Sequence, residues 1–188
     1  MNMPIFPLPI YLLPEGLTRL RIFEQRYINM IKNAEQTNGF VISYFQADSA
    51  QHISQWGSWV EIVNFELDDG GILVIDVRCK ALVTIGAAQH NTDNLLFADV
   101  SLKEHWAEQS HSIDCEELTK QLGLLFVKNK VLAQIYQHQF TDRAEWVCAR
   151  WLELLPVPFD DKNVFIDENS YEQAIDFLSQ IINQENYL

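Results

Sequence analysis

The sequence has few basic residues and no long apolar run. Its 188 residues include 13 lysines and arginines against 26 aspartates and glutamates, for a formal net charge of −13. Proteins that bind nucleic acid concentrate positive charge against the phosphate backbone, so this composition disfavours that class. No run of about 18 apolar residues occurs, so we expect no transmembrane helix. The proline-rich N-terminus also lacks the basic region and cleavage site of a signal peptide.

Cysteine is scarce as well. Cys79, Cys115 and Cys148 are an odd and widely spaced set, which does not make a disulfide framework. We therefore expect reduced thiols and a cytoplasmic location. The G-x-x-x-x-G-K-[ST] motif that binds nucleotide phosphates is missing too. No cofactor is expected.

Apolar residues, at 48% of the chain, are enough for a sizeable core. The pattern changes near residue 103. Residues 1–103 hold seven basic and eleven acidic residues and are rich in strand formers, whereas residues 104–188 hold six and fifteen and are helical in pattern. We therefore expect a β-barrel-like domain over residues 1–103 and a helical subdomain over residues 104–188.

Strand patterns dominate residues 1–103. We expect strands near residues 3–13, 40–45, 59–67, 72–77, 80–85 and 95–102. A helix is expected from Phe23 to Ala34, because its apolar residues fall on one helical face. Pro4, Pro7 and Pro9 cannot donate to a ladder, so the first strand should lie at an edge or be irregular. These features predict an α+β fold that begins with a small antiparallel β-barrel-like domain with one inserted helix.

Residues 104–188 follow the 3.6-residue period of amphipathic helices and predict a C-terminal three-helix subdomain. Ser, Thr and Asp before an apolar run are typical N-caps. The expected N-caps of the three helices are Asp114, then Thr141 or Asp142, then Ser170. Pro156 should end the second helix.

Two groups of residues are candidates for a site. Arg21, Glu24 and Arg26 lie where a strand joins a helix, and we expect them to pair as a structural charge network, because isolated buried charge is costly. An aromatic group would bind extended peptides if its members face water, and would fill the core if they do not. The candidate peptide-binding residues are Tyr11, Phe40, Tyr44, Trp56 and Trp59, with Phe45 in the same group.

Catalytic and metal sites are weakly supported. The spacing of His105, His111 and Cys115 matches no common zinc site. Calcium loops need a glycine and a spacing that are missing from Asp160, Asp161, Asp167 and Glu168. We therefore expect no metal. A cysteine-dependent hydrolase using Cys115 or Cys79 would need a base within reach of the thiol.

The start of the chain resembles a known family. It reads PIFPLPIYLLPEGLTRLRIFEQRYINM, similar to the opening of the N-terminal substrate-binding domain of Lon proteases: P-L-F-P-L, a short apolar strand, P-G, then L-x-I-F-E-x-R-Y-x-x-M. Later blocks agree in order and spacing, namely Phe40-Val41, Gly57–Ile62, Asp69–Leu73, Phe97–Val100, and Leu154-Leu155-Pro156 with Lys162. The family's glycine and arginine after the hairpin are missing from Val77–Ile85.

This resemblance implies a PUA-like fold and a non-enzymatic module that binds unfolded or degron-bearing polypeptides, with a protease or chaperone as a further partner. ATPase and protease motifs are not found in these 188 residues, so we expect a stand-alone relative of the recognition domain. A nucleic-acid-binding PUA-like module and a cysteine-dependent hydrolase are the alternatives. Nucleic acid and membrane partners are not expected.

Overall fold

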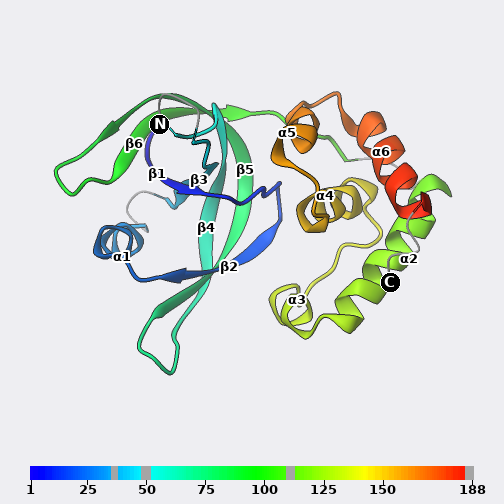
Figure 1. The fold of residues 1–188 in the computed structure, drawn as a ribbon, viewed down its shortest axis with the longest axis horizontal. Coiled ribbons are helices and arrows are strands. Elements are labelled where there is room, and N and C mark those ends of the chain that lie inside the picture. Colours follow the sequence, from blue (N-terminus) through cyan, green and yellow to red (C-terminus); the bar gives the residue numbers. More distant parts are fainter. Residues whose placement is uncertain (35–37, 48–51, 109–112, 185–188) are drawn as a thin grey trace. The chain divides into compact units, whose positions relative to one another are not determined.

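The computed structural model describes residues 1–34, 38–47, 52–108 and 113–184. The chain divides into two compact units, Met1–Lys103 (unit 1) and Glu104–Leu188 (unit 2) (Figure 1). The elements of unit 1 are β1 (Asn2–Leu8), β2 (Leu17–Ile22), α1 (Gln25–Lys32), β3 (Phe40–Tyr44), β4 (Trp56–Leu67), β5 (Leu73–His90) and β6 (Leu96–Lys103). The elements of unit 2 are α2 (Ile113–Lys128), α3 (Lys130–Ile135), α4 (Ala144–Leu154), α5 (Phe159–Lys162), the 3₁₀ helix η1 (Asn163–Ile166) and α6 (Tyr171–Gln184). That each unit is an independent domain stays a prediction.

Unit 1 is built on one mixed sheet of six strands. Their order is β2-β5-β4-β3-β1-β6, and β5 also pairs with β6, so the sheet closes into a ring. The ring is not a regular barrel, because among the described strands β2 pairs only with β5, so it lies outside the closed circle of strands. Together with the helices this confirms the expected α+β fold class.

The first strand differs from the sequence-based expectation. β1 ends at Leu8 and lies between two strands rather than at an edge. Its first half pairs antiparallel with β6 as far as Ile5, and its second half pairs with β3 from Ile5 onward. The β1–β3 pair is parallel, so the sheet is not wholly antiparallel, because the chain passes through β2 and α1 before it returns as β3.

β5 is a single strand of 18 residues that changes its neighbour on one side. Its first part, Leu73–Arg78, pairs with β2, and its later part, from Leu82 to His90, pairs with β6. β4 runs along its other side as far as Thr84. Residues 80–85 therefore extend the strand of residues 72–77 rather than begin another, which is one of the two possibilities that the sequence left open, and β5 is the strand that closes the ring.

The helix of unit 1 and the core follow the expected pattern in part. Tyr27, Met30 and Ala34 are buried, as the helical period predicts. Phe23 lies before the N-cap residue Glu24 and is 73% exposed, although the period placed it on the same face. One cluster of the sheet's core consists of Met3, Ile5, Val41, Ile53, Val83, Leu96, Ala98 and Val100.

Unit 2 contains more helical segments than the three that we expected. The first expected helix is interrupted at Asn129, whose side-chain oxygen accepts hydrogen bonds from the N–H groups of Val131 and Leu132, at 3.1 and 3.2 Å. Asn129 is thus the N-cap of α3. The segment between α4 and α6 adds α5 and η1.

The expected N-caps were wrong for two of the helices. Asp114 lies inside α2. Neither Thr141 nor Asp142 caps α4, which begins at Ala144 with Arg143 as N-cap residue and no side-chain cap bond. The Arg143 guanidinium instead lies 2.7 Å from the carboxylate of Glu145 in the first turn. α6 does begin directly after Ser170, and α4 ends shortly before Pro156, as expected.

Candidate functional site

A groove of about 400 Å³ lies in unit 1 where β6 begins beside β1. Its walls come from β1, from the joint between β2 and α1, from the turn between β5 and β6, and from the residues after β3. The main apolar lining residues are Phe6, Leu8, Phe23, Tyr27, Phe45 and Leu96.

The groove exists because β1 continues beyond its last pair with β6. The last pair between β1 and β6 is Ile5 with Leu96, whereas β1 continues to Leu8 beside β3. The Leu8 carbonyl accepts a hydrogen bond of 3.1 Å from the Phe45 N–H. Backbone groups alternate between the two sides of a strand, so those of Pro7 face the groove. Proline suits this position, since an N–H there would have no strand beside it.

Aromatic rings form the wall between β1 and α1. The rings of Phe6 and Tyr27 stack with centroids 3.9 Å apart, and Phe6 also lies 6.1 Å from Phe40. Burial raises the pKa of the Tyr27 hydroxyl. At the rim, Phe23 is 73% exposed and Phe45 is 48% exposed. Two large apolar side chains thus face water beside an apolar groove, which is the usual composition of a binding surface.

The charged residues of the groove are paired. Arg26 lies 2.9 Å from the carboxylate of Glu24 and also donates to the Asn94 carbonyl at 3.1 Å, so it joins α1 to the turn between β5 and β6. Arg21 pairs instead with Asp68. The three charges predicted as one network therefore form two separate pairs.

The predicted aromatic residues lie elsewhere, except for Phe45. Tyr11, Phe40 and Trp56 are buried, and Tyr44 and Trp59 are half-buried. None of these five lines the groove. Phe40 points into the sheet's interior, whereas Trp59 is held by its N–H on the Asn38 carbonyl, at 2.8 Å, and by the Lys80 ammonium over its ring. A peptide-binding role for the five stays a prediction.

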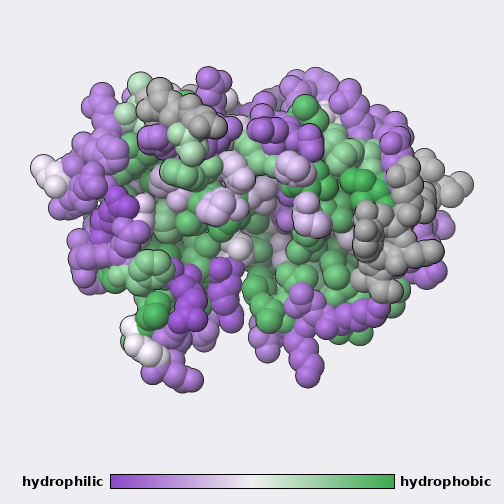
Figure 2. Space-filling model, viewed as in Figure 1, coloured by the Kyte–Doolittle hydropathy of each residue, from purple (hydrophilic) through white to green (hydrophobic). Residues whose placement is uncertain are grey.

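A second set of exposed apolar side chains lies on the hairpin between β4 and β5. Phe65 is 74% exposed and Leu67 is 70% exposed. Figure 2 shows green, apolar atoms among purple ones at this hairpin. The hairpin does not line the groove.

All three cysteines are buried free thiols. Cys79 is buried and donates to the Ala81 carbonyl at 3.5 Å. Cys115 and Cys148 are fully buried, with their sulfur atoms 4.0 Å apart. The hydrogen bond with Cys115, together with burial, raises the pKa of the Cys148 thiol. A buried, protonated thiol is a poor nucleophile.

Other candidate ligands are also used structurally. His105 binds the Phe165 carbonyl at 3.0 Å and stacks on Trp106, while His111 lies outside the described residues. Asp167 accepts from the Asn169 N–H at 3.0 Å. Within the described ranges, no three His, Cys, Asp or Glu side chains gather as they would around a metal ion. No helix in that part of the chain is long and apolar enough to cross a membrane.

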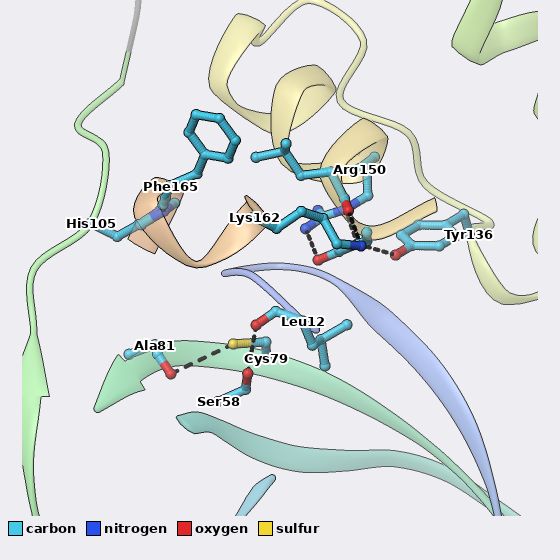
Figure 3. A network of polar contacts seen from close by, with 11 residues as sticks. Leu12, Ser58, Cys79, Ala81, His105, Tyr136, Arg150, Lys162 and Phe165 are labelled. Carbon is cyan, nitrogen blue, oxygen red and sulfur yellow. Dashed lines mark hydrogen bonds and ion pairs between the residues drawn. The ribbon is translucent and has the colours of Figure 1, made fainter. Parts of the chain in front are cut away.

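The buried charges of unit 2 support its helices (Figure 3). Arg150 is fully buried on α4, makes two hydrogen bonds of 2.7 Å to the carboxylate of Glu153, and lies near the rings of Tyr136 and Trp146. The Lys162 ammonium donates to the carbonyls of Leu152 and Leu155, at 2.9 and 3.2 Å, and so caps the C-terminal end of α4. Burial lowers the pKa of Lys162.

Comparison with known proteins identifies the family. Residues 2–184 match the model of the ATP-dependent protease La (LON) substrate-binding domain. The chain belongs to the Lon substrate-binding domain family. Two solved structures have a fold similar to that of this chain. A Lon N-terminal domain protein from Xanthomonas campestris is 22% identical, with a TM-score of 0.73 over 97% of this chain and 98% of that chain. The N-terminal domain of Mycobacterium avium complex Lon protease is 14% identical, with a TM-score of 0.64 over the whole of both chains.

A search of curated proteins gave no significant match. The family assignment gives the Lon-like signature of the first thirty residues a structural meaning. Its Pro7 and its Ile22-Phe23-Glu24 segment line the groove. The Lon-like closing element, with Lys162, builds the cap on α4.

Proposed function

We propose that this Lon-family module binds extended segments of non-native polypeptides in the groove beside β1, without bond chemistry. The observation that carries the proposal is the pairing of an apolar groove with two exposed phenylalanines, Phe23 and Phe45, at its rim. Unfolded chains expose apolar side chains that folded proteins bury, so such a groove selects for them. The family's description as a substrate-binding domain supports this function.

Two parts of the groove would contribute to binding. The rim phenylalanines and the wall of Phe6 and Tyr27 contact apolar side chains of the bound segment. The Pro7 carbonyl, on the side of β1 that β6 leaves uncovered, accepts a hydrogen bond from the segment's backbone. The module then acts as a receptor or adaptor that holds polypeptides for a partner protease or chaperone.

The test compares an unfolded with a folded form of one protein. Carboxymethylated α-lactalbumin, which stays unfolded, is titrated against the native form by fluorescence anisotropy. We expect binding of the unfolded form only. The double variant Phe23→Ser with Phe45→Ser should weaken it by about thirtyfold to a thousandfold, because each lost phenyl contact removes roughly 1–2 kcal/mol.

Phe140→Ser is the matched control, since Phe140 is 42% exposed and lies in unit 2. It should leave the affinity unchanged. Equal affinity for the unfolded and native forms, or equal losses in the groove variant and in the control, would refute the proposal. A nucleic-acid function has less support, because the net charge of −13 repels phosphates.

A further inference from the structure

The outer half of β4 has a free edge. β3 pairs with β4 only as far as Phe40 with Val60. At that point Gly39 lies directly against the Val60 carbonyl, because a Cβ on Gly39 would come within 2.0 Å of that oxygen. From Glu61 to Leu67, β4 pairs with β5 on one side and with no other strand among the described residues. Every second residue there directs its backbone groups outward.

Apolar side chains continue from the core to this edge. After a bulge between Ile62 and Asn64, Phe65 lies opposite Ile75, which in turn lies opposite Leu20 on β2. Residues opposite one another in an antiparallel sheet share a face. Ile75 is 0% exposed and Leu20 is buried, whereas Phe65 at the edge is largely in water. Leu67, Leu73 and Ile22 form a second such row.

The hairpin around this edge is acidic. Asp76 pairs with Arg19 at 2.7 Å, and Arg21 pairs with Asp68. Glu61 pairs with Arg78. The remaining acidic groups are Glu66, which lies 3.8 Å from Arg19, and Asp69, which is exposed. The acidic residues therefore outnumber the basic ones, and the local field favours a positively charged partner.

We propose that the outer edge of β4 binds an extended polypeptide segment of alternating apolar and basic residues as an additional strand. Backbone pairing with Glu61–Leu67 supplies the main contact, Phe65 and Leu67 contact the apolar side chains, and Glu66 and Asp69 attract the basic ones. A second copy of this chain is disfavoured as the occupant, because acidic residues would oppose one another across the pair. This surface is separate from the groove, so the inference does not rest on the proposed function.

The probe is a blocked synthetic peptide of alternating valine and lysine, about eight residues long, as in a typical strand. Its two controls are the same peptide with glutamate for lysine, and a fully N-methylated form that keeps the side chains but loses every backbone donor. By calorimetry, the lysine peptide should bind at least about tenfold more tightly than either control. Its affinity should fall as salt is raised, because screening weakens the attraction.

Phe65→Ser should weaken the lysine peptide by about tenfold, whereas Phe140→Ser, at an exposed side chain of unit 2, should not change it. Equal binding of the lysine and glutamate peptides, or equal effects of the two variants, would overturn the inference. A dimer of the free protein that Phe65→Ser abolishes would overturn the inference too, because a second copy would then occupy the outer edge of β4. If Phe65→Ser does not fold, the test is the affinity of the unaltered protein for the lysine peptide and for its N-methylated form. Equal affinities would overturn the inference.

Discussion

Unit 1 and unit 2 place their charged and aromatic side chains differently. In unit 1 the ion pairs remain in contact with water, and Phe23, Phe45 and Phe65 are exposed. In unit 2 the charged residues Glu145, Arg150 and Lys162 are buried, and Arg150 lies near the rings of Tyr136 and Trp146. The difference indicates that unit 2 uses buried charges to fix its fold, whereas unit 1 keeps its ion pairs and these three phenylalanines at its surface.

The largest effect is expected at the buried pair of unit 2. Glu153→Gln leaves Arg150 buried without its carboxylate, so it should lower the free energy of unfolding by about 3 kcal/mol. Chemical denaturation measures the loss. Replacing both residues, with Arg150→Met and Glu153→Leu, should recover much of it, since no lone charge remains. A loss below about 1 kcal/mol for Glu153→Gln would show that the pair is no more important than a surface pair.

Lys162 tests whether a single ammonium holds the end of α4. Lys162→Met keeps the length of the side chain but leaves the carbonyls of Leu152 and Leu155 without this donor. The expected cost is about 1–3 kcal/mol of unfolding free energy, from thermal or chemical denaturation. Lys120→Met, at an exposed residue of α2, is the control and should change stability little. Similar values for the two variants would contradict the capping role.

The corresponding charge in unit 1 should matter less. The hydrogen bond from Arg19 holds the pKa of Asp76 below its ordinary value of 3.8. The stabilisation is therefore present above pH 3.8 and is lost as the pH falls through the lower pKa of the folded state. Asp76→Asn should remove this part of the loss of stability at acid pH. At neutral pH it should lower the free energy of unfolding by less than about 1 kcal/mol, because solvent screens the partly exposed Arg19. Unfolding curves measured across this pH range give the free energy of unfolding at each pH. If the pair contributes nothing, its pH dependence will be the same in Asp76→Asn as in the unaltered protein.

The smallest effects on stability should come from the exposed phenylalanines of unit 1. Phe23→Ser and Phe65→Ser should each change the free energy of unfolding by no more than about 0.5 kcal/mol, because both side chains are already in water. The same variants should weaken the binding of their respective probes. A large loss of stability in either variant would mean that the side chain serves the fold, and the contrast between the units would fail at that residue.

The opening signature predicted the family by resemblance. Alternation and helical period predicted the α+β class and most elements, because they reflect which faces are buried. They failed where pairing partners are distant in sequence. The proline-containing strand was expected at an edge, since its pairing with two different strands in its two halves depends on β3 and β6. Phe23 was placed on the helix face because its spacing fits, although the helix begins only after Glu24.

The groove could not be predicted from the sequence for a similar reason. Phe40 and Phe45 belong to one run of β-formers, yet Phe40 is buried and Phe45 reaches the rim, because Phe45 lies past the end of β3. The one feature of the sequence that could have indicated an exposed Phe23 is its position directly before the N-cap residue Glu24. The conserved-looking Lys162 of the Lon-like closing element was noted for its resemblance alone, and its role in capping α4 required the structure.

The closure of the ring has a consequence for how the protein is made. β1 is synthesised first, but its antiparallel partner β6 lies nearly a hundred residues later, as the pair of Asn2 with Asp99 shows. While the chain emerges from a ribosome, β1 has no β6 to join until Lys103 is outside the exit tunnel. Such long-range pairing makes folding slow. The nascent chain is therefore, for a time, itself an exposed polypeptide of the kind that we propose the folded protein binds.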